Sequence, residues 1–449
     1  MERRLVIFVL TLLLIDTSSN AARLRFEAPS QSNDGSNDDI WAVLVAGSNG
    51  WYNYRHQADI CHAYHVLRNH GIKEGQIITL MYDDIANNSQ NPFPGQIFNA
   101  PKGKDVYGGV KIDYRGESVT PQNFLAILQG QKDKVKGGNG RVLKTSKSSR
   151  IFVYFADHGA PGSIAFPSSV LTVKQLNTAL KDMHKNERYS QLTFYLEACE
   201  SGSMFEKVLP SNIDVYAMTA ANSHESSWGC YCGTSAKLSV CLGDLFSVNF
   251  LQDSDKENLH TESLEKQFEI VKKETDQSHV QQFGNLTITN EPVADFQGEE
   301  DTPSKLPTDD VHAYEKWPSR DIPLKSLEAR LKFTNSVEKQ QALAAQIAEI
   351  RLKREYLHDH MTQFVRKLIH DPNIQNSMME KTPGAITNLD CHHDIVHAFD
   401  RACLRFGSNP YATNYVKVLA NLCEYQLPTE RILRELMDHC LDLKHTNIL

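Results

Sequence analysis

Five short apolar runs alternate with amphipathic stretches between residues 40 and about 290, and this alternation restricts the fold more than any other feature. Two amphipathic stretches, 58–70 and 172–185, have the spacing of helices with one buried face. Short β-branched and aromatic runs that alternate with helices are typical of βαβ units. The sequence therefore predicts an α/β domain with a mostly parallel central sheet flanked by helices. The predicted strands are Ile40–Gly47, Ile77–Met81, Arg150–Phe155, Leu192–Leu196 and Ile213–Ala217.

Two of these strands are followed directly by residues of types that act in catalysis. One breaks into Asp-His-Gly at 157–159, and the other into Glu-Ala-Cys at 197–199. If the strands are neighbours in a parallel sheet, His158 and Cys199 emerge at the same edge, where such sheets collect their chemistry. A Cys–His pair there is typical of acyl transfer, in which a thiolate attacks a carbonyl and the imidazole handles the leaving-group proton. Gly159 lets the backbone approach closely enough to donate an N–H to an oxyanion.

Length and charge exclude several classes of protein. The chain has 449 residues, of which 41% are hydrophobic and 23% charged, and its formal net charge is −8. This balance argues against disorder and against nucleic-acid binding through phosphate contacts. Residues 1–21 have a charged start, an apolar run of 11 residues and a small-x-small site, which is the layout of a secretory signal peptide. We expect no membrane span, and glycosylation at the sequons of Asn87 and Asn285.

The nine cysteines point to an oxidising compartment. Four of them lie within the last 60 residues and predict two disulfides, for which three connectivities are open. The remaining five include at least one thiol without a partner in the chain. A zinc site built on Cys230, Cys232 and Cys241 lacks a fourth ligand at a suitable spacing, so we expect no metal. The four clustered residues are Cys391, Cys403, Cys423 and Cys440.

Composition divides the rest of the chain into three parts. An α/β domain at 22–295 is followed by an acidic, Pro-containing linker at 296–325 and by a helical tail at 326–449. Within the tail, residues 326–370 form one long helical pattern rich in Ala, Leu, Glu, Lys and Gln. An exposed acidic linker is a natural place for proteolysis.

Several long motifs, in the same order, are similar to those of the legumains, the asparaginyl endopeptidases of the caspase-like cysteine protease clan. They are VLVAGSNGWYNYRHQAD at 43–59, MYDDIA at 81–86, Asp-His-Gly at 157–159 and EACESGSM at 197–204, and the four-Cys tail resembles the family's C-terminal prodomain. The resemblance implies a caspase-like fold, cleavage after Asn and, at lower pH, after Asp, and no cofactor. It implies Cys199 as nucleophile, His158 as its partner and Asn53 as the support of His158. The implied specificity pocket consists of Arg55, His56, Glu197, Ser226 and Asp244, with Ser227 adjoining.

The chemistry of that pocket suits an Asn side chain. A carboxamide offers two donors and an acceptor, so its pocket needs both carboxylates, here Glu197 and Asp244, and a cation, here Arg55. An Asp substrate meets two like charges until acid protonates one partner, which predicts a wider specificity at low pH. An ordinary surface ion pair between Arg55 and Asp244 is the alternative interpretation.

The tail is suited to respond to pH. From residue 311 onward it has 18 Lys and Arg against 17 Asp and Glu, and nine of the 18 His. We hypothesise that it caps the site at neutral pH, is released when acid charges its His, and is then removed by cleavage, as the resemblance also implies. A passive helical domain is the alternative. Asn335 lies close to the processing junction that the resemblance implies, and Asp309, Asp310 and Asp321 are other candidates.

The family pattern also gives the tail disulfides as Cys391–Cys423 and Cys403–Cys440. Cys232 and Cys241 are additional to that pattern and are candidates to pair with each other. We expect peptide and protein substrates, cystatin-type inhibitors and a monomeric zymogen. The expected destination is the lysosome, another acidic vesicle or the gut lumen, with secretion as an alternative.

Other functions stay open at this point. A peptide ligase uses the same acyl-enzyme, and an inactive binding protein could retain the fold. The intact Cys199, His158 and pocket residues argue against an inactive protein. The transamidase that attaches lipid anchors shares the clan, and it is disfavoured because the C-terminal part has no stretch that could span a membrane.

Overall fold

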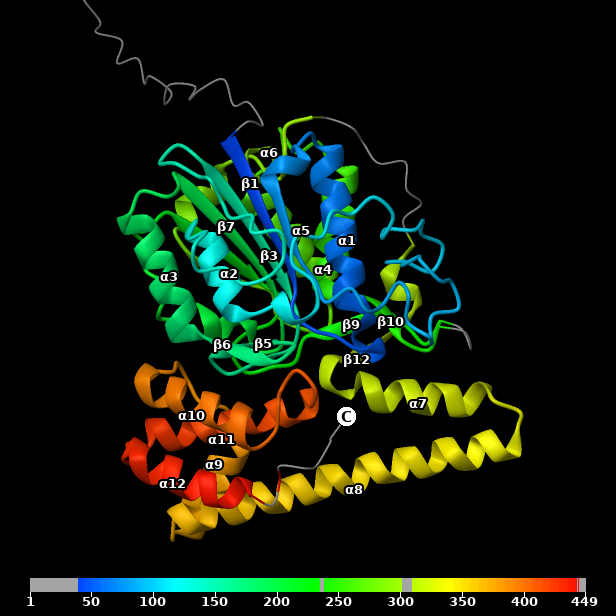
Figure 1. The fold of residues 1–449 in the computed structure, drawn as a ribbon, viewed down its shortest axis with the longest axis vertical. Coiled ribbons are helices and arrows are strands. Elements are labelled where there is room, and N and C mark those ends of the chain that lie inside the picture. The colour runs from blue at the N-terminus through cyan, green and yellow to red at the C-terminus, as the bar shows by residue number, and fades with distance from the viewer. Residues whose placement is uncertain (1–38, 235–237, 301–308, 442, 444–449) are drawn as a thin grey trace, which may run out of the picture. The chain divides into compact units, whose positions relative to one another are not determined.

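A six-stranded sheet lies at the centre of the computed structural model, which describes residues 39–234, 238–300, 309–441 and 443 (Figure 1). The strand order is β11-β8-β7-β3-β1-β2, and every pairing is parallel except that of β11 with β8. The predicted signal peptide lies outside the described residues. The strands are β1 Ile40–Ala46, β2 Ile77–Leu80, β3 Arg150–Ala156, β7 Gln191–Glu197, β8 Val215–Thr219 and β11 Gln281–Gly284.

Alternate residues of the strands face two separate cores, because successive side chains of a strand point to opposite faces. In β1, Ala42 and Leu44 join the core under α1, α4 and α5, whereas Val43 and Val45 join the core under α2 and α3. Helices therefore cover both faces, as expected for a buried parallel sheet. These helices are α1 Tyr54–Asn69, α2 Pro121–Leu128, α3 Val173–Lys185, α4 Leu245–Lys256, α5 Leu264–Glu274 and α6 Ala294–Gln297.

The predicted strands and the two predicted helices are confirmed, and the starts of β8 and α1 differ most from the predicted ranges. Strand β8 begins two residues later than predicted because Asp214 has a positive φ of 52° and belongs to the preceding turn. Helix α1 begins at Tyr54, four residues before the amphipathic pattern. The pattern misses the first turn because Arg55 and His56 are polar residues that are nevertheless buried. A search for apolar periodicity overlooks such residues.

Two small sheets lie beside the main one, and one of them recruits the predicted linker. Strand β12, Glu315–Pro318, pairs antiparallel with β9, so residues 315–318 are not an open connection. Asp309, which we expected to be exposed, is 7% exposed, and its carboxylate accepts a hydrogen bond of 2.7 Å from the Lys102 amide. The other strands of these sheets are β4 Gly159–Ala160, β5 Ser163–Phe166, β6 Ser169–Thr172, β9 Trp228–Cys232 and β10 Cys241–Asp244.

The C-terminal part is helical, but the long predicted helix is divided into two. Helix α7 ends at Phe333, and α8 begins after Ser336, whose hydroxyl accepts from the Lys339 amide. The break falls on Thr-Asn-Ser at 334–336, residue types that favour helix caps over helix interiors. The helices are α7 Ile322–Phe333, α8 Val337–Leu368, α9 Pro372–Glu380, α10 Leu389–Ala402, α11 Val416–Glu424 and α12 Thr429–Cys440.

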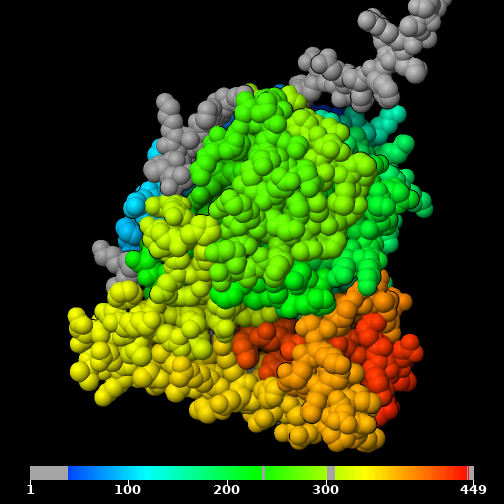
Figure 2. All heavy atoms as spheres, turned by 180° about the vertical axis from the view of Figure 1, so that it is seen from behind, coloured from blue at the N-terminus to red at the C-terminus, as the bar shows by residue number. Residues whose placement is uncertain are grey.

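Three disulfides join cysteines within the parts of the chain, not between them. Cys391–Cys423 and Cys403–Cys440 link α10 to α11 and α12, and Cys232–Cys241 links β9 to β10, as expected. Cys61, Cys199 and Cys230 are free and buried. Figure 2 shows the C-terminal helices, yellow to red, against the green part of the chain, where α10 packs on α3 and β6. No helix among the described residues has the length and apolar character needed to cross a membrane.

Candidate active site

His158 and Cys199 follow neighbouring strands, as the sequence predicted. In the parallel register of β3 and β7, Ala156 lies opposite Glu197, so each of the two candidate residues comes two positions after a paired residue. Both are buried, at 1% and 0% exposure. The fold therefore brings a thiol and an imidazole to the carboxyl edge of the sheet, where parallel α/β proteins bind their ligands.

The hydrogen bonds of His158 define its free nitrogen. Its Nε2 lies 2.8 Å from Asn53 Oδ1, and the Asn53 amide donates to the Asn49 carbonyl at 2.8 Å, so Asn53 offers His158 an acceptor. Nε2 therefore carries the proton of the neutral ring. Nδ1 is buried and has no partner among the described residues. Burial, followed by the charges of Arg55 and Arg320, lowers the pKa of His158 well below 6.5, so the ring is neutral and Nδ1 can accept a proton.

The Cys199 thiol lies against two serines. Its Sγ is 3.3 Å from Ser226 Oγ, 3.7 Å from Ser227 Oγ and 3.4 Å from the Ser227 amide. A Cβ at Gly159 would overlap the carbonyl oxygen of Cys199. Only glycine can therefore bring the backbone after His158 this close to the loop that carries Cys199.

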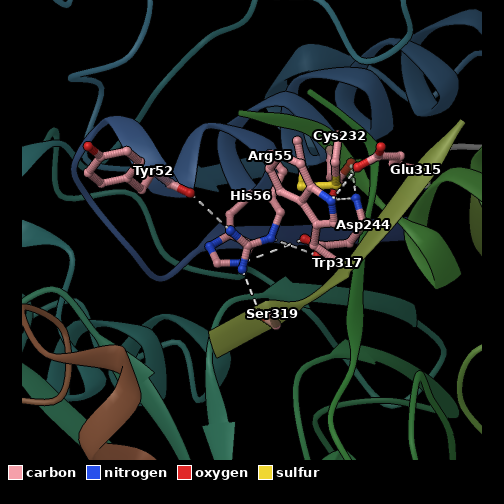
Figure 3. Close-up of a disulfide and its surroundings, with 10 residues drawn as sticks. Tyr52, Arg55, His56, Cys232, Asp244, Glu315, Trp317 and Ser319 are labelled. Carbon is pink, nitrogen blue, oxygen red and sulfur yellow. Dashed lines mark hydrogen bonds and ion pairs between the residues drawn. A yellow bond between two sulfur atoms is a disulfide. The ribbon is translucent and has the colours of Figure 1, made fainter. Parts of the chain in front are cut away.

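Arg55, one of the predicted pocket residues, is held by hydrogen bonds to three neighbours (Figure 3). Its guanidinium donates from Nε to Asp244 Oδ1 at 2.8 Å, from Nη1 to the Tyr52 carbonyl at 3.2 Å, and from Nη2 to Ser319 Oγ at 2.7 Å. Arg55 is 0% exposed, so this is not the surface ion pair considered as the alternative.

Two carboxylates in this region have one oxygen without a partner. Glu197 Oε2 accepts from the amide and the hydroxyl of Ser247 at 3.1 and 3.0 Å. Within the described part of the chain, Glu197 Oε1 and Asp244 Oδ2 have no hydrogen-bond donor. Burial raises the pKa of both carboxyl groups, strongly for Glu197. Unpaired polar atoms are costly inside a protein, and here they are available to a ligand amide.

His56 lies between Asp244 and His158, and its ring centroid is 5.2 Å from that of His158. Its Nδ1 is 2.6 Å from Ser48 Oγ, and its Nε2 is 3.5 Å from Asp244 Oδ2. Burial, then the charge of Arg55, lowers its pKa well below 6.5. Ligand atoms of His56, Asp157 and His158 lie within 4.8 Å of one another, close enough to hold a metal ion, but Ser48 and Asn53 each occupy one ring nitrogen.

Asp59, a buried carboxylate next to Asp244, was not among the site residues predicted from sequence. Asp59 accepts from the Asp244 amide at 3.1 Å and from Asn99 Nδ2 at 2.7 Å, and Asn99 in turn contacts His62. Burial and the Asp244 charge raise the pKa of Asp59 well above its usual value. Asp59 lies in the motif at 43–59, one helical turn after Arg55, and this spacing could have indicated that it lies near the pocket.

The segment after β12 reaches the candidate site, which the composition of the linker did not reveal. The Ser319 amide donates to the Ser227 carbonyl at 3.0 Å while its hydroxyl accepts from Arg55. Arg320, 7% exposed, forms an ion pair with Glu200 and donates to the Gly159 carbonyl at 2.7 Å. Ser319 therefore contacts a predicted pocket residue, and Arg320 contacts the loops that carry His158 and Cys199.

The remaining predicted sites lie on the surface. Asn335 is exposed between α7 and α8. Asn87 is exposed, whereas Asn285 is half-buried and its side chain contacts Thr287 and Asp214.

Comparison with known proteins agrees with this geometry. The Peptidase C13 family model matches residues 40–299, and the model of the legumain prodomain matches residues 345–440. The chain belongs to the C13 peptidase family. It is 46% identical to rat legumain over 408 residues, 89% of this chain and 92% of the relative. It is 43% identical to a hemoglobinase of Schistosoma mansoni (90% and 92% covered) and 38% identical to the vacuolar-processing enzyme delta-isozyme of Arabidopsis thaliana (97% and 98% covered).

Membership in this family makes the protein a cysteine endopeptidase that acts on peptides and carries a legumain-type prodomain. The mixed α/β domain and the helical C-terminal region have the predicted architecture.

Proposed function

We propose that this C13 peptidase is an asparaginyl endopeptidase made as a zymogen and activated by acid. The observation that carries the proposal is the buried cluster in which Arg55 pairs with Asp244 while one oxygen each of Glu197 and Asp244 has no hydrogen-bond partner among the described residues. A donor and two acceptors in one cluster match an Asn carboxamide, and an apolar or cationic side chain in place of Ser319 would leave Nη2 of Arg55 without an acceptor.

The proposed chemistry uses Cys199 as nucleophile and Nδ1 of His158 as its base. The thiol proton passes to Nδ1, and the C–S bond forms as sulfur attacks the carbonyl carbon of the substrate Asn residue, at the bond to be cleaved. Backbone amides beside Gly159 and Cys199 stabilise the oxyanion. The protonated Nδ1 then gives its proton to the leaving amine as the C–N bond breaks, and water hydrolyses the acyl-enzyme. Asn53 keeps the ring in the tautomer that leaves Nδ1 available.

The same pocket accounts for a specificity that widens with acid. An Asp substrate repels Glu197 and Asp244 while all three are ionised. Because burial raises the pKa of Glu197 and Asp244, one of them takes up a proton at a higher pH than an exposed carboxyl does. Cleavage after Asp should therefore increase as the pH falls, while cleavage after Asn does not need that proton.

Residues 319–320 and the C-terminal helices would hold the enzyme inactive before processing. Ser319 takes the place of a substrate side chain at Arg55, and Arg320 covers the nucleophile loop through Glu200. We propose exposed Asn335 as the processing site because it lies close to the junction that the family resemblance implies; exposed Asp310 is the alternative, whereas Asp309 is buried. An acidic lumen, such as a lysosome or the gut, is the compartment that suits such a zymogen, and cystatin-type inhibitors are candidate partners.

The test compares the purified proprotein with its Cys199→Ala variant at about pH 5. Chain mass is followed together with hydrolysis of matched peptides that have Asn, Asp, Lys or Ala before the scissile bond. Tail loss and cleavage after Asn, both absent from the variant, are expected. Hydrolysis with no preference for Asn would overturn the specificity assignment, and activity of the variant would overturn the role of Cys199. Joining of peptides with added amines would instead indicate a ligase.

A further inference from the structure

Strand β12 runs along β9 in the manner of a bound peptide. Trp317 lies opposite Gly229, Pro318 lies opposite Trp228, and the Ser319 amide continues the ladder to the Ser227 carbonyl. The Ser319 hydroxyl contacts Arg55. Ser319 therefore occupies the position of the substrate residue whose side chain enters the pocket. Trp317 then has the place of the residue two positions before it, on the same side of an extended strand.

The Trp317 side chain packs on the Cys232–Cys241 disulfide (Figure 3). It is 6% exposed, and a Cβ at Gly233 would lie 3.1 Å from its ring. Ile322 and Ala329 of α7 complete this apolar cluster from the opposite side. The disulfide, Gly229 of β9 and Gly233 directly after the strand thus form an apolar surface beside the Trp317 ring.

We infer that this surface is a substrate subsite, which accepts a large aromatic or branched apolar side chain two positions before the Asn. The inference rests on the proposed function, because it takes the register of β12 as the register of a substrate. A peptide that displaces β12 can form the same backbone hydrogen bonds to β9, and its side chain at that position replaces Trp317 on the disulfide. Carboxylate side chains would lose hydration there without gaining a partner.

The experiment measures kcat/KM of the activated enzyme for peptides X-Ala-Asn, with Trp, Leu, Ala or Asp at X. A parallel series X-Ala-Lys tests the dependence on Asn. We expect the Trp and Leu peptides to exceed the Ala peptide by about 10-fold and the Asp peptide by more, in line with the discrimination that apolar pockets achieve. A Cys232→Ser, Cys241→Ser double variant should lose this preference, which is measured as the ratio of its kcat/KM values for the Trp and Ala peptides.

The outcomes separate the two proposals. Cleavage after Asn at equal rates for all four residues at X overturns the subsite and leaves the asparaginyl activity intact. Loss of the Asn requirement overturns the proposed function itself. If the double variant fails to fold, the wild-type peptide series still decides, because a flat profile across X contradicts the inference without any variant.

Discussion

His392 lies where the prodomain meets the catalytic domain, and we expect it to carry much of the response to acid. It is 0% exposed, and its Nε2 donates to the Pro161 carbonyl at 2.9 Å, while a Cβ at Gly162 would lie 2.8 Å from its ring. The charged groups that act on it are His393 on its own helix and Glu424 on α11. Burial lowers its pKa to about 4, from 6.5 for an exposed ring.

The sign of the effect follows from these two values. Between pH 6.5 and pH 4 the released tail binds more protons at His392 than the docked tail does, so docking weakens throughout this interval as the pH falls. Between pH 7 and pH 5 the two pKa values give a change of about 20-fold in the docking equilibrium, or about 2 kcal/mol. The Arg320–Glu200 pair cannot supply this dependence, because burial raises the pKa of Glu200 and a raised carboxyl pKa opposes release on acidification.

The perturbation is His392→Gln, which retains an N–H for the Pro161 carbonyl and does not titrate. Self-activation is followed by chain mass from pH 7 to pH 4, and each rate is divided by the activity of the mature enzyme at that pH. Between pH 7 and pH 5, the increase in this normalised self-activation rate should be up to about 20-fold smaller for the variant than for the wild type. His370→Gln, at an exposed position of the same tail, is the matched control. A variant profile with the wild-type slope, whatever its absolute rate, would refute the reasoning.

Three further predictions follow from single contacts. Asn53→Ala should lower kcat by roughly 10- to 100-fold with little change in KM, because His158 loses the acceptor that orients it, and rescue by Asn53→Asp would identify the acceptor as the cause. Gly162→Ala should give activity towards an Asn peptide at neutral pH, since a Cβ there meets the His392 ring and φ is +70°; a silent zymogen at pH 7 would contradict this. Asn335→Gln should abolish the chain-mass change at pH 5, and unchanged processing would place the cut elsewhere.

The strand ends could be predicted from sequence because they depend on local signals. Apolar runs that break into His158 and Cys199 need only the parallel pairing of β3 and β7 to bring these residues to one edge. The pairing of the linker with the catalytic domain could not be predicted in this way. The pairing of β12 with β9 joins residues about 85 positions apart, and neither acidic composition nor Pro content reports such a contact.

Other residues were missed for different physical reasons. The division of the predicted long helix at Asn335 rests on cap-forming residue types, whose signal is weaker than the helix-forming composition around them. Asp59 was part of a recognised motif, but its role depends on the depth at which α1 is buried, and a single sequence does not give that depth.

The position of Asn335 means that one cut would create two inhibitors with different behaviour. A cut after Asn335 leaves Ser319 and Arg320 covalently attached to the catalytic domain, so their local concentration at the pocket does not fall on dilution. The disulfide-linked α10, α11 and α12 become a separate molecule, because no disulfide joins them to the catalytic domain. The binding of this released tail to the catalytic domain then depends on the concentrations of both molecules. The tail dissociates on dilution and can bind again where the enzyme is concentrated.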